Sequence, residues 1–344
     1  MQSLLYKGPW RIAIADCPEP AEPTGREVLV RIRATGVCGT DLGIVTGAYQ
    51  ARIPVILGHE STGEVVAVGE AVESLQAGAR VVIDPTYFCG FCAMCRTGRP
   101  NHCERKTRTE TGVSRDGTFA PYYKTEERFL YPLAGTVSFE AGTLVEPLSC
   151  ALTGVDRLRT RSDLRTVVLG AGPLGVLYAF ALAAKGLGGA LVEIAEERRA
   201  LAVAVTGAGW RGCATLEEAV DSVSSNGEVD LIVDTTGVLG QRSLPLLARG
   251  GQLLTIGLRS ASCAVDMLRV ADRSLSIIGS IDSLGTFNAA KELIERGFVP
   301  AERIVSHRWE LADYRQAFLH LGCDLDSRVY TGNARALKAV LRPA

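Results

Sequence analysis

Four cysteines crowd into one short stretch of the chain, at Cys89, Cys92, Cys95 and Cys103. A tetrahedral zinc ion accepts four thiolates, and short loops between the ligands let one lobe of chain wrap around it. Because four cysteines leave no coordination position open, such an ion would be structural and would supply folding energy to the lobe. An iron–sulfur cluster also uses four thiolates and is the alternative occupant. We expect the neighbouring His102 to be a surface residue rather than a fifth ligand.

A second set of metal-binding residue types is spread over the first 150 residues, at Cys38, His59, Glu60 and Glu146. One thiolate, one imidazole and one or two carboxylates make a catalytic type of zinc site, which keeps a position open for water or substrate. Taken singly, each residue has a structural explanation, such as a buried core thiol, a hydrogen-bonded histidine or an acid at a helix start. Their occurrence together with the cysteine cluster and a dinucleotide-binding motif favours the catalytic interpretation.

The dinucleotide-binding motif is a GxGxxG sequence at residues 170–175, which follows a predicted strand and opens a predicted helix. Gly170 permits the tight turn, Gly172 lets the backbone approach a pyrophosphate, and Gly175 allows the helix to pack on the sheet. Pro173 and Leu174 belong to the first helical turn, where the missing N–H of proline costs nothing. The pyrophosphate is expected at the positive end of this helix.

Glu193 predicts which nicotinamide cofactor binds. It lies 18 residues beyond Gly175, at the end of the second predicted strand. A carboxylate at this point accepts hydrogen bonds from both ribose hydroxyls and repels a 2′-phosphate. The next residues, Ile194 and Ala195, offer no positive charge or hydroxyl to such a phosphate, and Arg198 is expected to line the adenosine edge. We therefore predict NAD rather than NADP.

The two kinds of site together define a reaction. Zinc bound to an alcohol oxygen acts as a Lewis acid and makes an alkoxide reachable near neutral pH, from which hydride passes to the nicotinamide ring. Thr40, two residues after Cys38, is placed to take the hydroxyl proton through its own hydroxyl. We expect a zinc-dependent alcohol dehydrogenase that uses NAD and holds two zinc ions per chain, one catalytic and one structural.

The elements that must position these residues follow two patterns. The first 130 residues have short alternating segments separated by glycine and proline, which predict strands at 27–34, 64–68 and 79–83. From residue 166, apolar strands alternate with helices and predict a doubly wound parallel sheet. The expected strands lie at 166–169, 190–193, 229–234, 251–257 and 275–279.

The tail after residue 285 contains too few elements to form its own core, so we expect it to return to the first domain. The predicted fold class is α/β. A Rossmann domain would occupy residues 149–287, and a β-rich catalytic domain that carries the zinc sites would comprise residues 1–148 and 288–344.

Composition excludes several classes of function. The chain has 344 residues, 47% of them hydrophobic and 22% charged, which is typical of a two-domain globular protein. A net charge of −1 gives no global field for binding nucleic acid or an anionic membrane. The longest apolar stretch, around residues 174–184, is shorter than the ~20 residues that span a bilayer, and no export signal is recognisable at the N-terminus. We expect a cytoplasmic enzyme with a small-molecule substrate and neither a nucleic-acid nor a membrane partner.

The residues above resemble those of the zinc-dependent medium-chain dehydrogenase family over essentially the whole chain. The match includes that family's zinc signature, which here runs from Gly58 through His59 and Glu60 to Gly63 and Gly69. The resemblance implies a GroES-like catalytic domain and a homodimer or homotetramer. It also implies catalytic zinc ligands at Cys38 and His59, with Glu60 bound directly or held behind a water.

Two positions bear on the substrate. Glu146, followed by Pro147, is similar to the glutamate used by the polyol and threonine dehydrogenase branches, where alcohol dehydrogenases have a second cysteine. This implies a small polar alcohol, such as a polyol, sugar or cyclitol, whose secondary hydroxyl is oxidised to a ketone. Many relatives have a proton-relay histidine two residues after the aspartate that corresponds to Asp41, but this chain has Gly43. The exit of the proton therefore stays open between the ribose, ordered water and Glu60.

Two alternatives stay open. An amino-alcohol dehydrogenase, acting on L-threonine or an aminocyclitol, would fit the same ligands, although Gly43 weakens the threonine assignment. A non-catalytic protein that only binds NAD and zinc would have no physical need for Cys38, His59 and Glu146 together.

Overall fold

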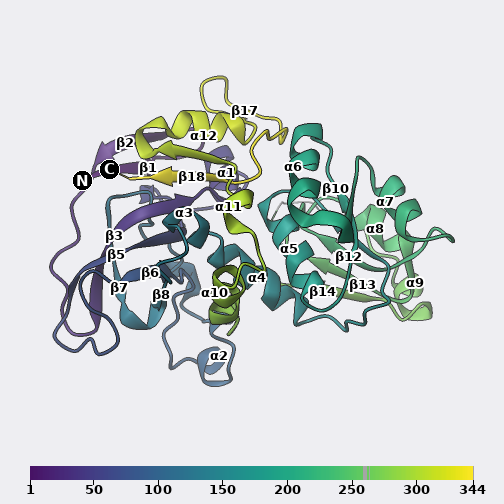
Figure 1. Ribbon diagram of the computed structural model, residues 1–344, viewed down its shortest axis with the longest axis horizontal. Helices are drawn as coiled ribbons and strands as arrows, with labels where there is room; N and C mark the ends of the chain where they lie inside the picture. Colours follow the sequence, from purple (N-terminus) through teal and green to yellow (C-terminus); the bar gives the residue numbers. More distant parts are fainter. Residues whose placement is uncertain (259–261, 263, 344) are drawn as a thin grey trace. The chain divides into compact units, whose positions relative to one another are not determined.

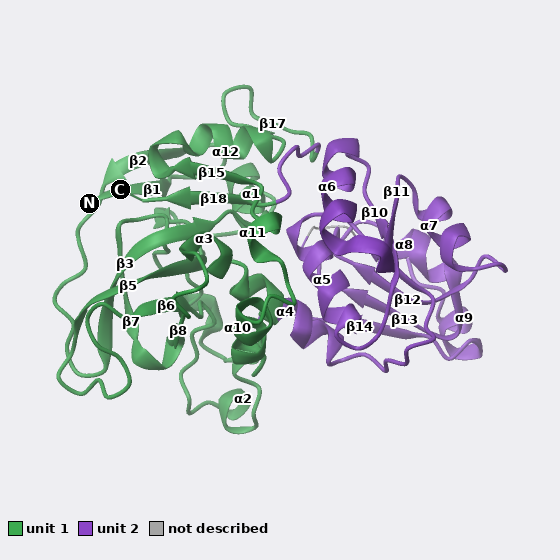
Figure 2. Ribbon diagram, viewed as in Figure 1, with its two compact units in different colours: residues 1–149, 283–332, 338–344 green, residues 150–282, 333–337 purple. Residues whose placement is uncertain are grey.

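The computed structural model describes residues 1–258, 262 and 264–343, and the chain forms two compact units (Figures 1 and 2). Unit 1 comprises residues 1–149, 283–332 and 338–344, and unit 2 comprises residues 150–282 and 333–337. The division expected from the sequence places the first boundary one residue earlier and the second boundary five residues later, and it assigns residues 333–337 to the catalytic domain rather than to unit 2.

Unit 1 is built on a seven-stranded sheet in the order β15-β18-β3-β5-β6-β8, with β7 also paired to β3. Its strands are β3 (Glu27–Gly36), β5 (Glu60–Val68), β6 (Arg80–Ile83), β7 (Tyr122–Glu126), β8 (Leu130–Pro132), β15 (His307–Glu310) and β18 (Ala339–Arg342). The last two come from the tail of the chain. Because β18 pairs with β3, the tail completes the sheet that the N-terminal residues begin.

Smaller elements complete unit 1. A three-stranded sheet contains β1 (Gln2–Tyr6), β2 (Ile12–Asp16) and β4 (Val55–Ile56), and β16 (Cys323–Asp324) pairs with β17 (Val329–Tyr330). The helices are α1 (Gly39–Thr46), α2 (Ala93–Arg96), α3 (Phe139–Gly142), α10 (Phe287–Glu295), α11 (Ala301–Ile304) and α12 (Tyr314–His320). A further helix, α4 (Val145–Val155), begins in unit 1 and ends in unit 2.

The core of unit 1 follows from alternation along β3. Val28, Val30 and Ile32 are buried, whereas the intervening Arg31 and Arg33 are exposed, as a period of two residues requires. The buried face packs with residues of β5, β6, β7 and β8 into one cluster. This rigid sheet fixes where the ends of β3 and β5 lie.

Unit 2 is a six-stranded parallel sheet in the order β11-β10-β9-β12-β13-β14. If these six strands are numbered 1 to 6 along the chain, their order in the sheet is 3-2-1-4-5-6, which is the order of the Rossmann fold. The strands are β9 (Thr166–Leu169), β10 (Gly189–Val192), β11 (Trp210–Cys213), β12 (Val229–Asp234), β13 (Leu247–Thr255) and β14 (Ser276–Gly279). The helices are α5 (Pro173–Ala183), α6 (Glu196–Thr206), α7 (Leu216–Val223), α8 (Gly240–Ser243) and α9 (Met267–Asp272).

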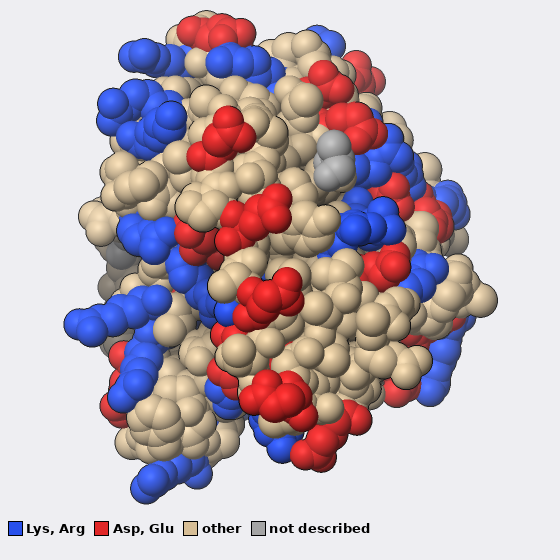
Figure 3. Space-filling model, turned by 90° about the vertical axis from the view of Figure 1, so that its left-hand side faces the viewer, with Lys and Arg blue, Asp and Glu red and all other residues tan. Residues whose placement is uncertain are grey.

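The strand order confirms the expected Rossmann sheet. Within this parallel sheet, the strand missed by sequence reasoning is β11, whose central Arg211 and Gly212 are exposed and give no apolar run. No helix in the described part of the chain is long and apolar enough to cross a membrane. On the face drawn in Figure 3, basic and acidic side chains both occur among uncharged ones.

Candidate functional site

Strand register brings the first three candidate ligands together. Gly36, the last residue of β3, is paired with Glu60, the first residue of β5. Cys38 lies just past the end of β3, and His59 lies just before the start of β5, so both fall at the same end of this antiparallel pair. The ligand atoms of Cys38, His59 and Glu60 all lie within 4.8 Å of one another.

Asp41 fastens the two segments that carry these ligands. It is fully buried, and its carboxylate accepts hydrogen bonds from the backbone N–H of Cys38 at 2.9 Å and of Gly58 at 3.3 Å. The first of these bonds belongs to a capping box, in which Cys38 is the N-cap of α1 and Thr40 N–H donates to its sulfur at 3.5 Å. Burial raises the pKa of Asp41, whereas the charge of His59 and the bond from Cys38 lower it. Asp41 therefore ties the segment that carries Cys38 to the segment that carries His59.

The surroundings of His59 favour a positive charge. Burial lowers its pKa, but the charges of Cys38 and Asp41 outweigh burial, and Glu146 adds to them, so the pKa lies well above its usual value. Its Nδ1 is buried with no hydrogen-bond partner among the described residues, and Asp41 Oδ1 is 3.9 Å away. A histidine that binds metal through one nitrogen commonly offers the other to a carboxylate, so this donor set fits a divalent cation.

Lys338 is the residue of this site that sequence reasoning missed. Its ammonium forms an ion pair with Glu60, and both side chains are almost completely buried, at 1% and 2% exposure. The same ammonium donates to the carbonyl oxygen of Val37 at 3.2 Å. A single lysine just before the apolar strand β18 is the only signal that could have pointed to it. The position of the Glu60 carboxylate is therefore fixed by a buried ion pair with a lysine.

The other two candidate catalytic residues, Glu146 and Thr40, are not part of the group formed by Cys38, His59 and Glu60. Glu146 is the second residue of α4, and its charge reaches His59, but it is outside the group whose ligand atoms lie within 4.8 Å. Thr40 is half-buried in the first turn of α1. Arg115 and Asp116 have hydrogen-bond partners within the protein. Arg115 donates to Lys124 O at 3.3 Å, and Asp116 accepts from Ile56 N at 3.1 Å.

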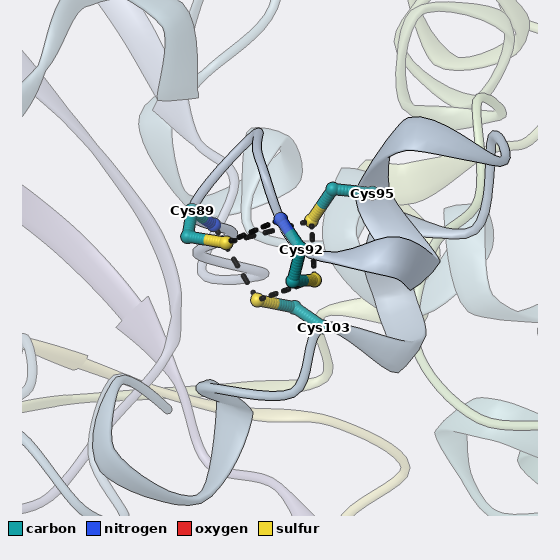
Figure 4. Close-up of side chains that lie close together, drawn as sticks. All are labelled: Cys89, Cys92, Cys95 and Cys103. Atoms are coloured by element: carbon teal, nitrogen blue, oxygen red, sulfur yellow. Dashed lines mark hydrogen bonds between the residues drawn. The ribbon is translucent and has the colours of Figure 1, made fainter.

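The four-cysteine cluster is assembled (Figure 4). The sulfur of Cys92 lies 3.4 Å from that of Cys95 and 4.0 Å from that of Cys103, and Cys89 and Cys95 sulfurs are 3.9 Å apart. A tetrahedron with Zn–S bonds of ~2.3 Å has sulfur–sulfur edges of about 3.8 Å. All four cysteines are free thiols, and these separations far exceed the ~2.05 Å of a disulfide.

The charges in this lobe also suit a cation. Backbone hydrogen bonds from Cys95 and Glu104 lower the pKa of Cys92 to about 6, so this sulfur is a thiolate at neutral pH. Burial and the neighbouring thiols raise the pKa of Cys95 to about 12. His102, next to Cys103, is exposed. The cluster is consistent with a structural zinc lobe.

The glycine-rich loop in unit 2 connects β9 to α5. Gly170 has φ +87°, which favours glycine, and a side chain on it would meet Thr235 at 2.7 Å. Gly172 is the N-cap of α5, and a Cβ on it would have nothing within 4 Å, so the backbone is open to a ligand. A Cβ on Gly175 would collide with the carbonyl oxygen of Gly170. Pro173 and Leu174 form the half-exposed first turn of the helix.

Glu193 follows directly after β10 and is buried, with 3% exposure. Its carboxylate accepts the N–H of Ala171 at 3.2 Å and that of Ala195 at 3.0 Å. Arg198 donates to the same carboxylate from Nε at 2.8 Å and from Nη2 at 2.9 Å. Glu193 thus ties the glycine-rich loop to the start of α6, and Arg198 lies where the adenosine ribose is expected.

Comparisons with known proteins identify relatives over almost the whole chain. Residues 24–135 match the family model described as the alcohol dehydrogenase GroES-like domain. The chain is 32% identical to D-altritol 5-dehydrogenase of Agrobacterium fabrum over 91% of this chain and 94% of that protein. It is 30% identical to sorbitol dehydrogenase of Bacillus subtilis over 92% of each. The structure of 2R,3R-butanediol dehydrogenase from Bacillus subtilis superposes with a TM-score of 0.83 at 25% identity, covering 100% of this chain and 99% of that one.

Proposed function

The chain belongs to the zinc-containing medium-chain dehydrogenase family, in its polyol dehydrogenase-like branch, and is an oxidoreductase that acts on CH–OH groups; from this premise we propose that it oxidises a secondary hydroxyl of a polyol, sugar or cyclitol to a ketone, with NAD as hydride acceptor. The observation that carries the proposal is the convergence of a thiolate, an imidazole and a carboxylate, from Cys38, His59 and Glu60, where β3 ends and β5 begins. This combination suits catalysis because it leaves a coordination position for substrate.

Each residue of the site has a proposed role. Cys38 and His59 would hold a zinc ion with Glu146 and Glu60 as the carboxylates, and the bound ion would supply a Lewis acid that lowers the pKa of the substrate hydroxyl. Thr40 accepts the hydroxyl proton, since its side chain is on the first turn of α1, beside the ligand Cys38. We assign Asp41 to orienting His59, whose Nδ1 lies 3.9 Å from Asp41 Oδ1, and its buried carboxylate keeps the two ligand segments in register.

The proton must then leave Thr40 without a histidine, because position 43 is glycine. Of the three exits expected from the sequence, Glu60 is disfavoured because its carboxylate is already paired with the buried Lys338. We therefore assign the exit to a ribose hydroxyl of the cofactor or to ordered water.

Glu193 supports NAD as the cofactor. Its carboxylate is buried at the end of β10, and a carboxylate here accepts the ribose hydroxyls and repels a 2′-phosphate. The guanidinium of Arg198 donates two hydrogen bonds to that carboxylate. Binding of the ribose hydroxyls to Glu193 therefore requires that one or both of these hydrogen bonds break. We assign Arg198 to the adenosine edge of the bound cofactor.

We further propose two zinc ions per chain, a cytoplasmic location and a homodimer or homotetramer. The cysteines in the described part of the chain are free thiols, as expected in a reducing compartment. At the end of the parallel sheet, β14 presents the exposed Ile277, and the neighbouring α9 exposes Met267 and Leu268. An open strand edge beside exposed apolar side chains supports pairing with a second copy of the chain.

The proposal is tested by incubating the zinc-loaded protein with NAD or NADP and a panel of candidate alcohols, and following NADH formation by absorbance. The panel contains linear polyols, sugars, inositols, aminocyclitols, threonine and simple alcohols. We expect turnover of a polar secondary alcohol with NAD, and none by a Cys38→Ala variant that retains its structural zinc. Turnover of threonine or an aminocyclitol alone would replace the polyol proposal, and a Cys38→Ala variant with full activity would refute the zinc mechanism.

A further inference from the structure

Three aromatic rings of unit 1 face one another away from the residues discussed so far. His307 and Trp309 lie two residues apart on β15 and therefore on the same face of the strand. His320 is the last residue of α12, which packs against β15. The ring centroids of His307 and Trp309 are 5.3 Å apart, those of His307 and His320 are 5.4 Å apart, and those of Trp309 and His320 are 5.1 Å apart. All three rings are half-buried.

Hydrogen bonds engage Nδ1 of both histidines. Nδ1 of His320 lies 2.9 Å from the backbone oxygen of Gln316, which can only accept, so Nδ1 is the protonated nitrogen of the neutral ring. Nδ1 of His307 lies 2.8 Å from the hydroxyl oxygen of Ser306, which accepts from Lys338 N at 3.2 Å and lies 3.2 Å from Lys338 O. Binding of a cation at Nε2 of His307 places the ring proton on Nδ1, where the Ser306 oxygen can accept it.

We propose that His307 and His320 form a third metal site, which binds a divalent transition cation through their two Nε2 atoms. An imidazole centroid lies about 3.2 Å from a metal bound at ~2.05 Å, so two imidazoles at a tetrahedral angle have centroids about 5.2 Å apart. The observed separation is 5.4 Å. In both rings the second nitrogen is fixed by a hydrogen bond to oxygen, which is the arrangement that orients metal-binding histidines.

The class of cation follows from the ligands. Neutral imidazole suits zinc, copper and nickel, and two ligands leave positions for water, so the cation should exchange. Burial, together with the neighbouring His320, lowers the pKa of His307, which keeps this ligand neutral at pH 7. The charged side chains nearest in sequence are engaged in ion pairs of their own: Arg308–Glu302, Arg342–Glu310 and Arg315–Asp326.

A short series of hydrogen bonds and one ion pair connects the proposed site to Glu60. Ser306 binds the backbone of Lys338 through its hydroxyl and through its N–H, which donates to Lys338 O at 3.1 Å. The side chain of Lys338 pairs with Glu60. A cation on His307 would strengthen the bond to Ser306, so its effect on turnover would pass through Lys338 rather than through the substrate.

Nickel is a suitable probe, because Trp309 reports on the site by fluorescence quenching. Ni²⁺ is titrated into the zinc-loaded full-length protein, and bound nickel and retained zinc are both counted by elemental analysis after dialysis. We expect one nickel per chain with no loss of zinc. His307→Gln and His320→Gln should each weaken binding by at least about tenfold. His102→Gln, which changes an exposed histidine elsewhere, is the matched control and should bind as the wild type does.

A fourth variant keeps the test independent of folding. Trp309→Phe retains both histidines, so it should bind nickel and lose most of the quenching. Melting temperatures of all variants show whether they are folded. The proposal is overturned if folded His320→Gln binds nickel as tightly as the wild type, or if the wild type takes up no nickel at millimolar concentration.

Discussion

Replacing Lys338 with methionine tests the buried ion pair behind the catalytic site. The change keeps most of the side-chain volume and removes the charge. The carboxylate of Glu60, which is 2% exposed, would then lose its partner in the interior of unit 1. The hydrogen bond from Lys338 to Val37 O would be lost as well. The first loss acts at the start of β5, and the second acts on the segment that leads from β3 into Cys38.

The magnitude follows from burial. Removing one partner of a buried ion pair typically costs about 3–5 kcal/mol, because the remaining charge is uncompensated. For a unit of about 200 residues, 1 kcal/mol lowers the melting temperature by roughly 2–4 °C, which gives a loss of about 6–20 °C. Lys185, which pairs with Asp156 at 44% and 53% exposure, is the matched control. An exposed pair contributes about 0–1 kcal/mol, so Lys185→Met should change little.

A double-mutant cycle separates the ion pair from simple loss of packing. Glu60→Gln alone leaves a buried ammonium without its partner, whereas Glu60→Gln with Lys338→Met removes both charges. We expect the double variant to be more stable than the sum of the single losses predicts, by at least about 1 kcal/mol. The assay is thermal and urea unfolding, with zinc content measured for each variant. Additive losses, or a Lys338→Met variant as stable as Lys185→Met, would refute the argument.

Four further predictions concern other parts of the molecule. Cys103→Ser should lower the zinc content from two ions to one per chain and make the four-cysteine lobe sensitive to proteolysis, because the metal supplies the folding energy of the lobe. A variant that retains both ions would contradict the structural assignment. Glu193→Ala should reduce the preference for NAD over NADP by at least about tenfold, measured as a ratio of kcat/KM values. The change removes the charge that repels a 2′-phosphate, and it frees Arg198 to bind such a phosphate. An unchanged ratio would exclude this role of Glu193. The hydroxyl of Tyr178 is buried without a hydrogen-bond partner among the described residues, so Tyr178→Phe should leave the melting temperature unchanged or raise it. Gly154→Ala, whose new methyl would collide with that hydroxyl, should destabilise by about 1–3 kcal/mol, and equal losses with and without Tyr178→Phe would show that the collision is not the cause.

The parallel sheet was predictable because its signals are local. Strands β9 and β12 have the bounds expected from their apolar runs, Thr166–Leu169 and Val229–Asp234. A strand buried on both faces needs apolar residues at nearly every position, and such a run is visible without knowing its neighbours. The strand β11 lies at the end of the sheet, where exposed residues are tolerated, so its sequence gives no comparable run.

The candidate site was predictable to the extent that residue type indicates chemistry. Cysteine, histidine and glutamate at characteristic spacings mark metal ligands before any contact is known, and the roles assigned to them remain proposals. The residues that contact those ligands could not be predicted from residue type. Nothing in the local sequence indicates that the carboxylate of Asp41 accepts a hydrogen bond from the backbone N–H of Gly58.

Lys338 could not be found in this way, because pairing between distant strands creates its role. Val340 of β18 is paired with Gly36 of β3, and Gly36 is in turn paired with Glu60 of β5. These two registers put a lysine from the end of the chain beside a glutamate nearly 280 residues earlier. They also explain Gly36, because a side chain there would collide with both Glu60 and Lys338. The ion pair between Glu60 and Lys338 therefore requires a glycine at this position of β3.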